Sequence, residues 1–168
     1  MTTSTPPSGW PPVSPSGRIT YRPATPEDAT ELAPKLRQSD TAEMALTWAG
    51  SPEARLAESV QASAESWVLL VDGGAEALFG LVRYPKWNVP WMRCSADVGL
   101  HARELLTHGR AWLNSVRDRR TPFANTVAAD NADAHKLLER LGFVIGGVAP
   151  DQGPPGSFRY FYEVPHRV

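Results

Sequence analysis

The sequence predicts an α+β domain in which helices flank a mixed, mostly antiparallel sheet. The first observation is a hairpin: two apolar runs, 67–71 and 76–84, are separated by Asp-Gly-Gly, a tight-turn composition. The second is the stretch 130–143, which describes a complete amphipathic helix followed by a strand. Because hairpins outnumber crossovers, a doubly wound α/β sheet is not expected. A chain of 168 residues suits one such domain.

The first third of the domain predicts one strand and three helices. Residues 19–22 alternate as a short strand. Thr-Pro-Glu-Asp at 25–28 then opens a helix, with threonine as N-cap, proline at the first position and an acidic residue at the third. Pro34 should kink or restart this helix. Residues 40–49 predict a second short helix, and Ser-Pro-Glu at 51–53 begins a third.

After the hairpin, residues 91–100 predict the fourth strand, 102–117 a long helix and 123–129 the fifth strand. The following helix has Asp130 as its expected N-cap and Gly142 as the left-handed residue that ends it. Residues 143–145 begin the next strand, and the alternating run 158–164 closes the sheet. Asn131 is the exception to this structural pattern, because a polar amide beside the free N–H groups of a first turn is well placed to hold a ligand.

Composition restricts the function classes. Seventeen basic and eighteen acidic residues give a formal charge of −1, which indicates no nucleic-acid partner. A single cysteine, Cys94, excludes an internal disulfide and suits a reducing compartment. No apolar run approaches the ~20 residues that span a bilayer, and the N-terminus lacks a basic–apolar secretory pattern. We therefore expect a cytoplasmic protein without a membrane partner.

Residues 1–17 predict a proline-rich arm, extended or disordered, that precedes a domain at 18–168. Five of the sixteen prolines lie in this arm, which is too poor in apolar groups to order itself by burial. Trp10 stands between glycine and two prolines, where it could anchor the arm on a protein partner or on the domain's own surface. A docking element and a weakly ordered tail both remain open, as does a homo-oligomer.

The stretch that begins at Asn131 follows the pattern Asn-x-x-Ala-x-x-Leu-x-x-x-Leu-Gly-Phe. This resembles the C-terminal motif of the GCN5-related N-acetyltransferases, the GNAT superfamily. Arg-Pro-Ala-Thr-Pro-Glu-Asp-Ala at 22–29, after a first strand, is also typical of the N-termini of that superfamily. The resemblance implies a GNAT fold with a V-shaped opening between the fourth and fifth strands. It also implies acetyl-CoA or another acyl-CoA as co-substrate, with Asn131 beside the pantetheine arm.

Other positions depart from the family pattern. The family holds the CoA pyrophosphate in a glycine-rich loop before the helix that follows the fourth strand, and here only Gly109-Arg110-Ala111 resembles it. Gly109 and Arg110 are thus the remaining cofactor-binding candidates, although the stretch could be helical from 102 onward. The family's general-acid tyrosine corresponds to Leu138, which has no proton to give. Asp97 is the only candidate base on the expected fourth strand, and a capping role for it is the alternative.

Nucleophile and metal chemistry receive little support. Cys94 and Asp97 would point to opposite faces of a strand, so they form no triad with His101. The four histidines lack metal-ligand spacing, and we expect no metal.

A closer resemblance covers about residues 18–164. The combination of the 22–29 motif, the Trp-Val hairpin, Val-Pro-Trp-Met before the fourth strand and the 130–143 motif is similar to bacteriophage GNAT-like proteins, some of which are virion components. Two functions therefore stay open. One is an acyl-CoA-dependent N-acetyltransferase that acts on an amine. The other is a catalytically degenerate bacteriophage virion protein, structural or interacting, with the arm as docking element and assembly into the virion.

Overall fold

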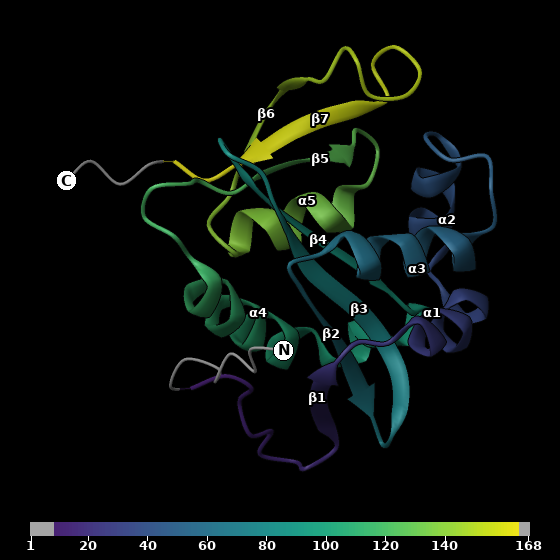
Figure 1. The fold of residues 1–168 in the computed structure, drawn as a ribbon, viewed down its shortest axis with the longest axis vertical. Helices are drawn as coiled ribbons and strands as arrows, with labels where there is room; N and C mark the ends of the chain where they lie inside the picture. Colours follow the sequence, from purple (N-terminus) through teal and green to yellow (C-terminus); the bar gives the residue numbers. More distant parts are fainter. Residues whose placement is uncertain (1–8, 165–168) are drawn as a thin grey trace.

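The structure, a computed structural model, describes residues 9–164. Its strands form two half-sheets (Figure 1). The first is antiparallel in the order β1-β2-β3-β4, and the second is antiparallel in the order β5-β7-β6. The bounds are β1 (Ile19–Pro23), β2 (Glu65–Val71), β3 (Gly74–Arg83), β4 (Asn88–Cys94), β5 (Ala124–Ala128), β6 (Val144–Val148) and β7 (Phe158–Tyr162).

The two half-sheets meet where β4 and β5 begin. One parallel bridge joins Asn88 to Phe123, and the Asn88 N–H donates to the Pro122 carbonyl at 2.9 Å. The Asn125 side chain donates to the Pro90 carbonyl at 2.9 Å. Beyond these contacts no bridge joins the two strands within residues 9–164, so they part toward their carboxyl ends. The predicted α+β class and the V-shaped opening between the fourth and fifth strands are confirmed.

The helices between β1 and β2 are α1 (Pro26–Leu32), α2 (Gln38–Ala45) and α3 (Pro52–Ala62), with a 3₁₀ turn, η1 (Ala33–Lys35), after α1. The predicted start of α1 is confirmed, because the Asp28 carboxylate accepts the Thr25 N–H at 2.8 Å. The same carboxylate pairs with Arg22 at 2.7 Å and ties α1 to β1. Pro34 lies in η1, where the predicted break occurs.

Tight turns at two other places follow the predicted chemistry. Asp72 and Gly73 join β2 to β3 with positive φ values of 50° and 86°, the left-handed pair that a two-residue hairpin needs. Gly142 ends helix α5 (Ala132–Arg140) with φ 97°, and the next N–H, of Phe143, returns to the Leu138 carbonyl at 3.0 Å.

Two local predictions are wrong. The fourth strand ends at Cys94, and the chain turns into a 3₁₀ helix, η2 (Ala96–His101), before helix α4 (Ala102–Val116). At this end of β4 the Cys94 N–H donates to the Asp40 carboxylate at 3.1 Å, which caps the edge that faces β5. The N-cap of α5 is Asn131 rather than Asp130, because the Asn131 Oδ1 accepts the Ala134 N–H at 3.2 Å.

Helices α1 and α3 lie on one side of the first half-sheet and α4 and α5 on the other (Figure 1). One apolar cluster packs under each pair of helices. Trp10 belongs to the second cluster. It is 6% exposed, and its ring lies 4.9 Å from Tyr21 and 6.0 Å from Phe79, measured between centroids. The sequence left two anchoring sites open for Trp10, a protein partner and the domain's own surface. In the structure Trp10 packs against the domain itself.

Residues 1–8 of the predicted arm fall outside the described range, so a partner contact through the arm, a homo-oligomer and the domain boundary at 18 stay predictions. Within residues 9–164 no helix combines the length and apolar character needed to cross a membrane.

Candidate functional site

A cleft opens where β4 and β5 part, between helices α4 and α5, and encloses a cavity of about 170 Å³. Its walls are mostly apolar. The two helices contribute Leu105, His108, Gly109, Trp112, Leu113, Asn131, Ala134, Leu137, Leu138 and Leu141, and the strands contribute Phe79, Pro90 to Cys94, Asn125 to Val127, and Phe161. A mainly apolar, concave site with a few placed polar groups is typical of a small-molecule pocket.

The free edge of β4 supplies the polar groups of this cleft. Alternate residues of β4 bond to β3, and the others face β5. Three of the residues that face β5 are satisfied inside the protein: Asn88 by Pro122, Pro90 by the Asn125 side chain, and Cys94 by Asp40 and the Arg37 N–H. By the same alternation Met92 directs its N–H and C=O into the cleft, and no residue of the 9–164 segment bonds them there.

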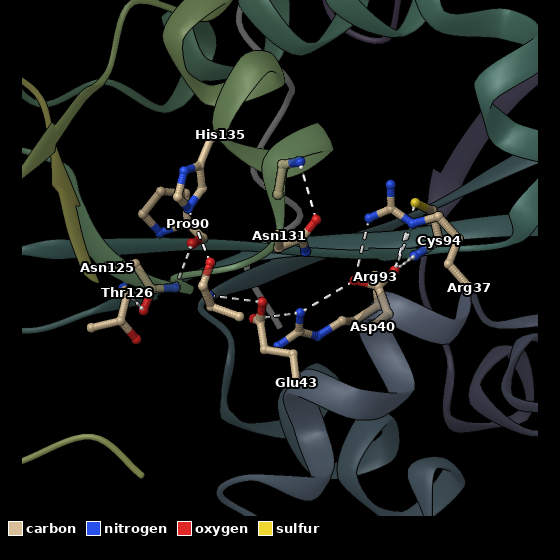
Figure 2. A network of polar contacts seen from close by, with 12 residues as sticks. Arg37, Asp40, Glu43, Pro90, Arg93, Cys94, Asn125, Thr126, Asn131 and His135 are labelled. Atoms are coloured by element: carbon tan, nitrogen blue, oxygen red, sulfur yellow. Dashed lines mark hydrogen bonds and ion pairs between the residues drawn. The ribbon is translucent and has the colours of Figure 1, made fainter. Parts of the chain in front are cut away.

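The opposite side of the parting is filled by an ion-pair network from α2, which we call the α2 network and define as Arg37, Asp40, Glu43 and Arg93 (Figure 2). Arg93 Nη1 donates to Glu43 Oε1 at 2.9 Å and approaches Asp40 Oδ1 at 3.4 Å. The two carboxylates are 6% and 1% exposed.

The α2 network also bridges the two half-sheets. Glu43 accepts the Ala128 N–H of β5 at 3.0 Å, while Asp40 accepts the Cys94 N–H of β4 at 3.1 Å (Figure 2). His135 Nε2 lies 3.0 Å from the Ala128 carbonyl. The Cys94 and Ala128 backbone groups at the open ends of both strands are therefore satisfied by the protein itself, and the N–H and C=O of Met92 are among the polar groups that remain in the cleft.

The cofactor-binding candidates are only partly brought together. Asn131 and Gly109 line the cleft from α5 and α4. Arg110 does not: it is exposed, and its Nη2 donates to the Arg140 carbonyl at 2.6 Å, at the far end of α5. Gly109 and Arg110 lie inside α4 rather than before it, so they form no glycine loop at a helix start. As the alternative predicted, α4 is helical from Ala102.

The catalytic candidates lie apart from the cleft. Asp97 is exposed on η2, outside strand β4 and outside the cleft walls, because β4 ends three residues earlier. Leu138, which the sequence resemblance aligned with the family's tyrosine, does line the cleft. The carboxylates in the cleft walls are Asp40 and Glu43, and both are held in the α2 network.

One pair in the cleft was missed by the sequence analysis. The Tyr21 hydroxyl lies 2.6 Å from His108 Nδ1. Burial, and then the charge of Glu104, raises the pKa of Tyr21, and burial lowers the pKa of His108 although Glu104 opposes this. Both groups are therefore neutral at pH 7. The spacing of Leu105, His108 and Trp112 on one helix face was the available signal for His108, but nothing local pairs it with Tyr21.

Cys94 is not a nucleophile. Burial, and then the charge of Asp40, raises its pKa to about 12, so the thiol stays protonated at neutral pH. No group of three or more metal-binding side chains occurs within residues 9–164.

Comparisons with known proteins bear on the fold. No protein-family model matches the chain, and no curated protein sequence does so. Solved structures do match. Ard1 from Thermoplasma volcanium is 18% identical with a TM-score of 0.62, over 86% of this chain and 95% of that one. An acetyltransferase of the GNAT family from Bacillus anthracis is 10% identical with a TM-score of 0.60, over 89% and 96% of the two chains.

This chain has the GNAT fold. A third neighbour, the acetyltransferase AAC(6')-Ib in complex with ribostamycin and coenzyme A, is 17% identical with a TM-score of 0.61, over 87% of this chain and 93% of that chain. At these identities the likeness establishes the GNAT fold alone. The activity of this GNAT-fold chain must be argued from its cleft.

Proposed function

We propose that this protein is an N-acyltransferase that takes an acyl group from a thioester of coenzyme A and gives it to an amine. One observation carries the proposal. The parted strands β4 and β5 leave the peptide group of Met92 facing an apolar cleft between α4 and α5.

The cleft suits the pantetheine arm of the donor. The arm is a narrow, largely apolar chain with two amides, and an extended chain can pair with an exposed strand edge through backbone hydrogen bonds. Met92 offers one N–H and one C=O for that pairing. The Asn131 carbonyl oxygen is already bonded to the Ala134 N–H, so its NH₂ group is what remains for a ligand.

The phosphates of the donor have no built cradle. The first turn of α4 carries Glu104, and Gly109 lies a turn further into the helix. Arg103 lies in the same first turn and is exposed. We expect most of the binding free energy to come from the arm, with a dissociation constant on the order of 0.1–1 mM.

The transfer needs little from side chains. The amine nitrogen attacks the thioester carbonyl carbon, the new C–N bond forms, and the C–S bond breaks with its electrons on sulfur. Alignment of the arm along Met92 is the main contribution of the protein. Both carboxylates of the cleft walls are ion-paired, so neither is free to take a proton from the amine. The amine must therefore arrive neutral, and the one N–H proton that it loses as the amide forms passes to water. Leu138 supplies no acid, so the sulfur leaves as a thiolate.

The test is calorimetric titration of acetyl-CoA into the wild type and two variants. Met92→Pro removes the N–H that faces the cleft, and β4 already carries a proline at position 90 on the same edge. Met92→Leu keeps the N–H and is the matched control. We expect Met92→Pro to weaken binding at least tenfold and Met92→Leu to leave it within twofold. No heat of binding at millimolar acetyl-CoA with folded wild type would refute the proposal.

The neighbour from Bacillus anthracis and AAC(6')-Ib are acetyltransferases. They give no support to the alternative prediction of a bacteriophage virion module, and no feature of the cleft favours it.

A further inference from the structure

One part of the cleft is lined by a cluster of aromatic side chains. Trp10, Tyr21, Phe79, His108 and Trp112 line it, and we call these five residues the aromatic end. Phe79 and Trp112 meet edge to face at 5.0 Å between centroids, and Tyr21 and His108 do so at 5.5 Å. These rings come from the N-terminal segment, β1, β3 and α4, so the aromatic end is a feature of the folded domain.

The aromatic end is continuous with the part of the cleft where the donor arm would lie. Phe79 is the direct cross-strand partner of Met92. Both side chains pack into the cluster that α4 and α5 cover, and both line the same cavity. A group attached to the end of an arm at Met92 would therefore extend over Phe79 toward Tyr21.

Two hydrogen-bond donors at the aromatic end have no acceptor within residues 9–164. The Trp10 indole N–H is buried with its side chain 6% exposed, and no acceptor for it exists among residues 9–164. The indole N–H of Trp112, in contrast, donates to Glu65 Oε1 at 3.0 Å. Tyr21 and His108 are both neutral and share one hydrogen bond, so whichever way it points, one O–H or N–H of the pair is left over. Of these two donors the Trp10 N–H is the buried one without a partner; such a donor is costly, and a ligand oxygen would satisfy it.

Size separates the ligands that could fill this space. An engineered apolar cavity of about 150 Å³ takes up benzene. The cavity here is of that order, about 170 Å³ over the whole cleft, and the acyl group would share it with the tip of the donor arm.

We propose that the aromatic end is an acyl subsite that takes a ring-sized or branched acyl group of about six carbons bearing an oxygen, rather than acetyl. This inference rests on the proposed function, because the acyl group arrives on the thioester donor. The transfer is unchanged: the product is the N-acyl amine and the free thiol of the donor.

The experiment measures dissociation constants of the full-length protein for CoA, acetyl-CoA, hexanoyl-CoA, benzoyl-CoA and 4-hydroxybenzoyl-CoA, with phenol as a probe that needs no donor arm. Each buried methylene adds about fourfold in affinity. We expect benzoyl-CoA to bind at least tenfold more tightly than acetyl-CoA. The 4-hydroxyl should add about fivefold, the value of one hydrogen bond.

Two tyrosine variants test the polar part of the subsite. Tyr21→Phe keeps the ring and removes the hydroxyl, so it should keep the preference for benzoyl-CoA over acetyl-CoA and reduce the extra affinity for the 4-hydroxybenzoyl group, while the N–H groups of Trp10 and His108 remain as donors. Tyr160→Phe makes the same change on an exposed tyrosine of β7 and should alter neither ratio.

The outcomes separate the two proposals. If CoA and acetyl-CoA bind and benzoyl-CoA is no tighter, the acyl subsite is wrong and the proposed function stands. If no CoA compound binds but phenol does, the proposed function fails, and with it the acyl role of the aromatic end. If Tyr21→Phe does not fold, the preference of the wild type for benzoyl-CoA over acetyl-CoA decides the inference alone.

Discussion

Replacement of Glu43 by alanine should cost about 3–5 kcal/mol of unfolding free energy, the usual penalty for breaking a buried ion pair from one side. Glu43 is 6% exposed, and both of its oxygens are used. Oε1 accepts from Arg93 at 2.9 Å and Oε2 accepts the Ala128 N–H at 3.0 Å. The variant leaves a buried N–H without a partner, a penalty of about 1–3 kcal/mol. It also leaves Arg93 with only the longer contact to Asp40, at 3.4 Å.

Urea denaturation followed by tryptophan fluorescence measures this loss. Glu58→Ala is the matched control, because Glu58 is also a helical glutamate paired with an arginine, Arg55, at 2.6 Å, but its side chain is 51% exposed. The control should cost less than about 1 kcal/mol. A double-mutant cycle of Glu43→Ala with Arg93→Met should return a coupling above about 1 kcal/mol.

The reasoning is refuted if Glu43→Ala costs no more than Glu58→Ala. That result would mean that the α2 network does not hold the two half-sheets together. Glu43→Gln should fall between wild type and alanine, because an amide can accept from Arg93 or from Ala128 but turns its own NH₂ toward the other donor.

The remaining predictions concern single side chains. Asn131→Ala should lower the free energy of unfolding, measured in urea, by about 0.5–2 kcal/mol because it removes the N-cap of α5. The control Asp130→Ala, at an exposed position, should stay within about 0.5 kcal/mol of the wild type. Equal losses in the two variants would contradict the capping role of Asn131. Cys94, with its raised pKa of about 12, should resist a disulfide reagent at pH 8 in the native state and react fully in urea, and rapid native labelling would count against its burial. Burial acts to raise the pKa of Asp28, but the hydrogen bonds from Arg22 and Thr25 outweigh it and the pKa is lowered. Its contribution to stability should therefore be complete above the ordinary aspartate pKa of about 3.9 and fade as pH falls below it; an Asp28→Asn difference that stayed constant from pH 7 to 3 would contradict this.

Features that depend on neighbouring residues were predictable from the sequence. The hairpin turn at Asp72 and Gly73 and the helix stop at Gly142 need left-handed backbone, which short sequence signals reveal. The cap of α5 was assigned one residue early because asparagine and aspartate are nearly equal N-caps. The pattern at 130–143 could not choose between them.

Features that depend on distant residues were not predictable. The edge of β4 that faces β5 is capped at Cys94 by Asp40, which lies 54 residues earlier in the chain. Tyr21 and His108 are 87 residues apart and meet only after the sheet and α4 have packed. The same distance effect left Asp97, a strand candidate in the sequence, exposed on a 3₁₀ helix and outside the cleft.

The α2 network has a consequence for the order in which substrates would meet. It lies between the open ends of β4 and β5, so under the proposed function a donor and an acceptor would both enter between α4 and α5. A donor arm that lies deeper along Met92 would have to arrive first, and the thiol product could leave only after the acylated amine. Such a site would show compulsory-order kinetics, with the free thiol competing against the donor alone.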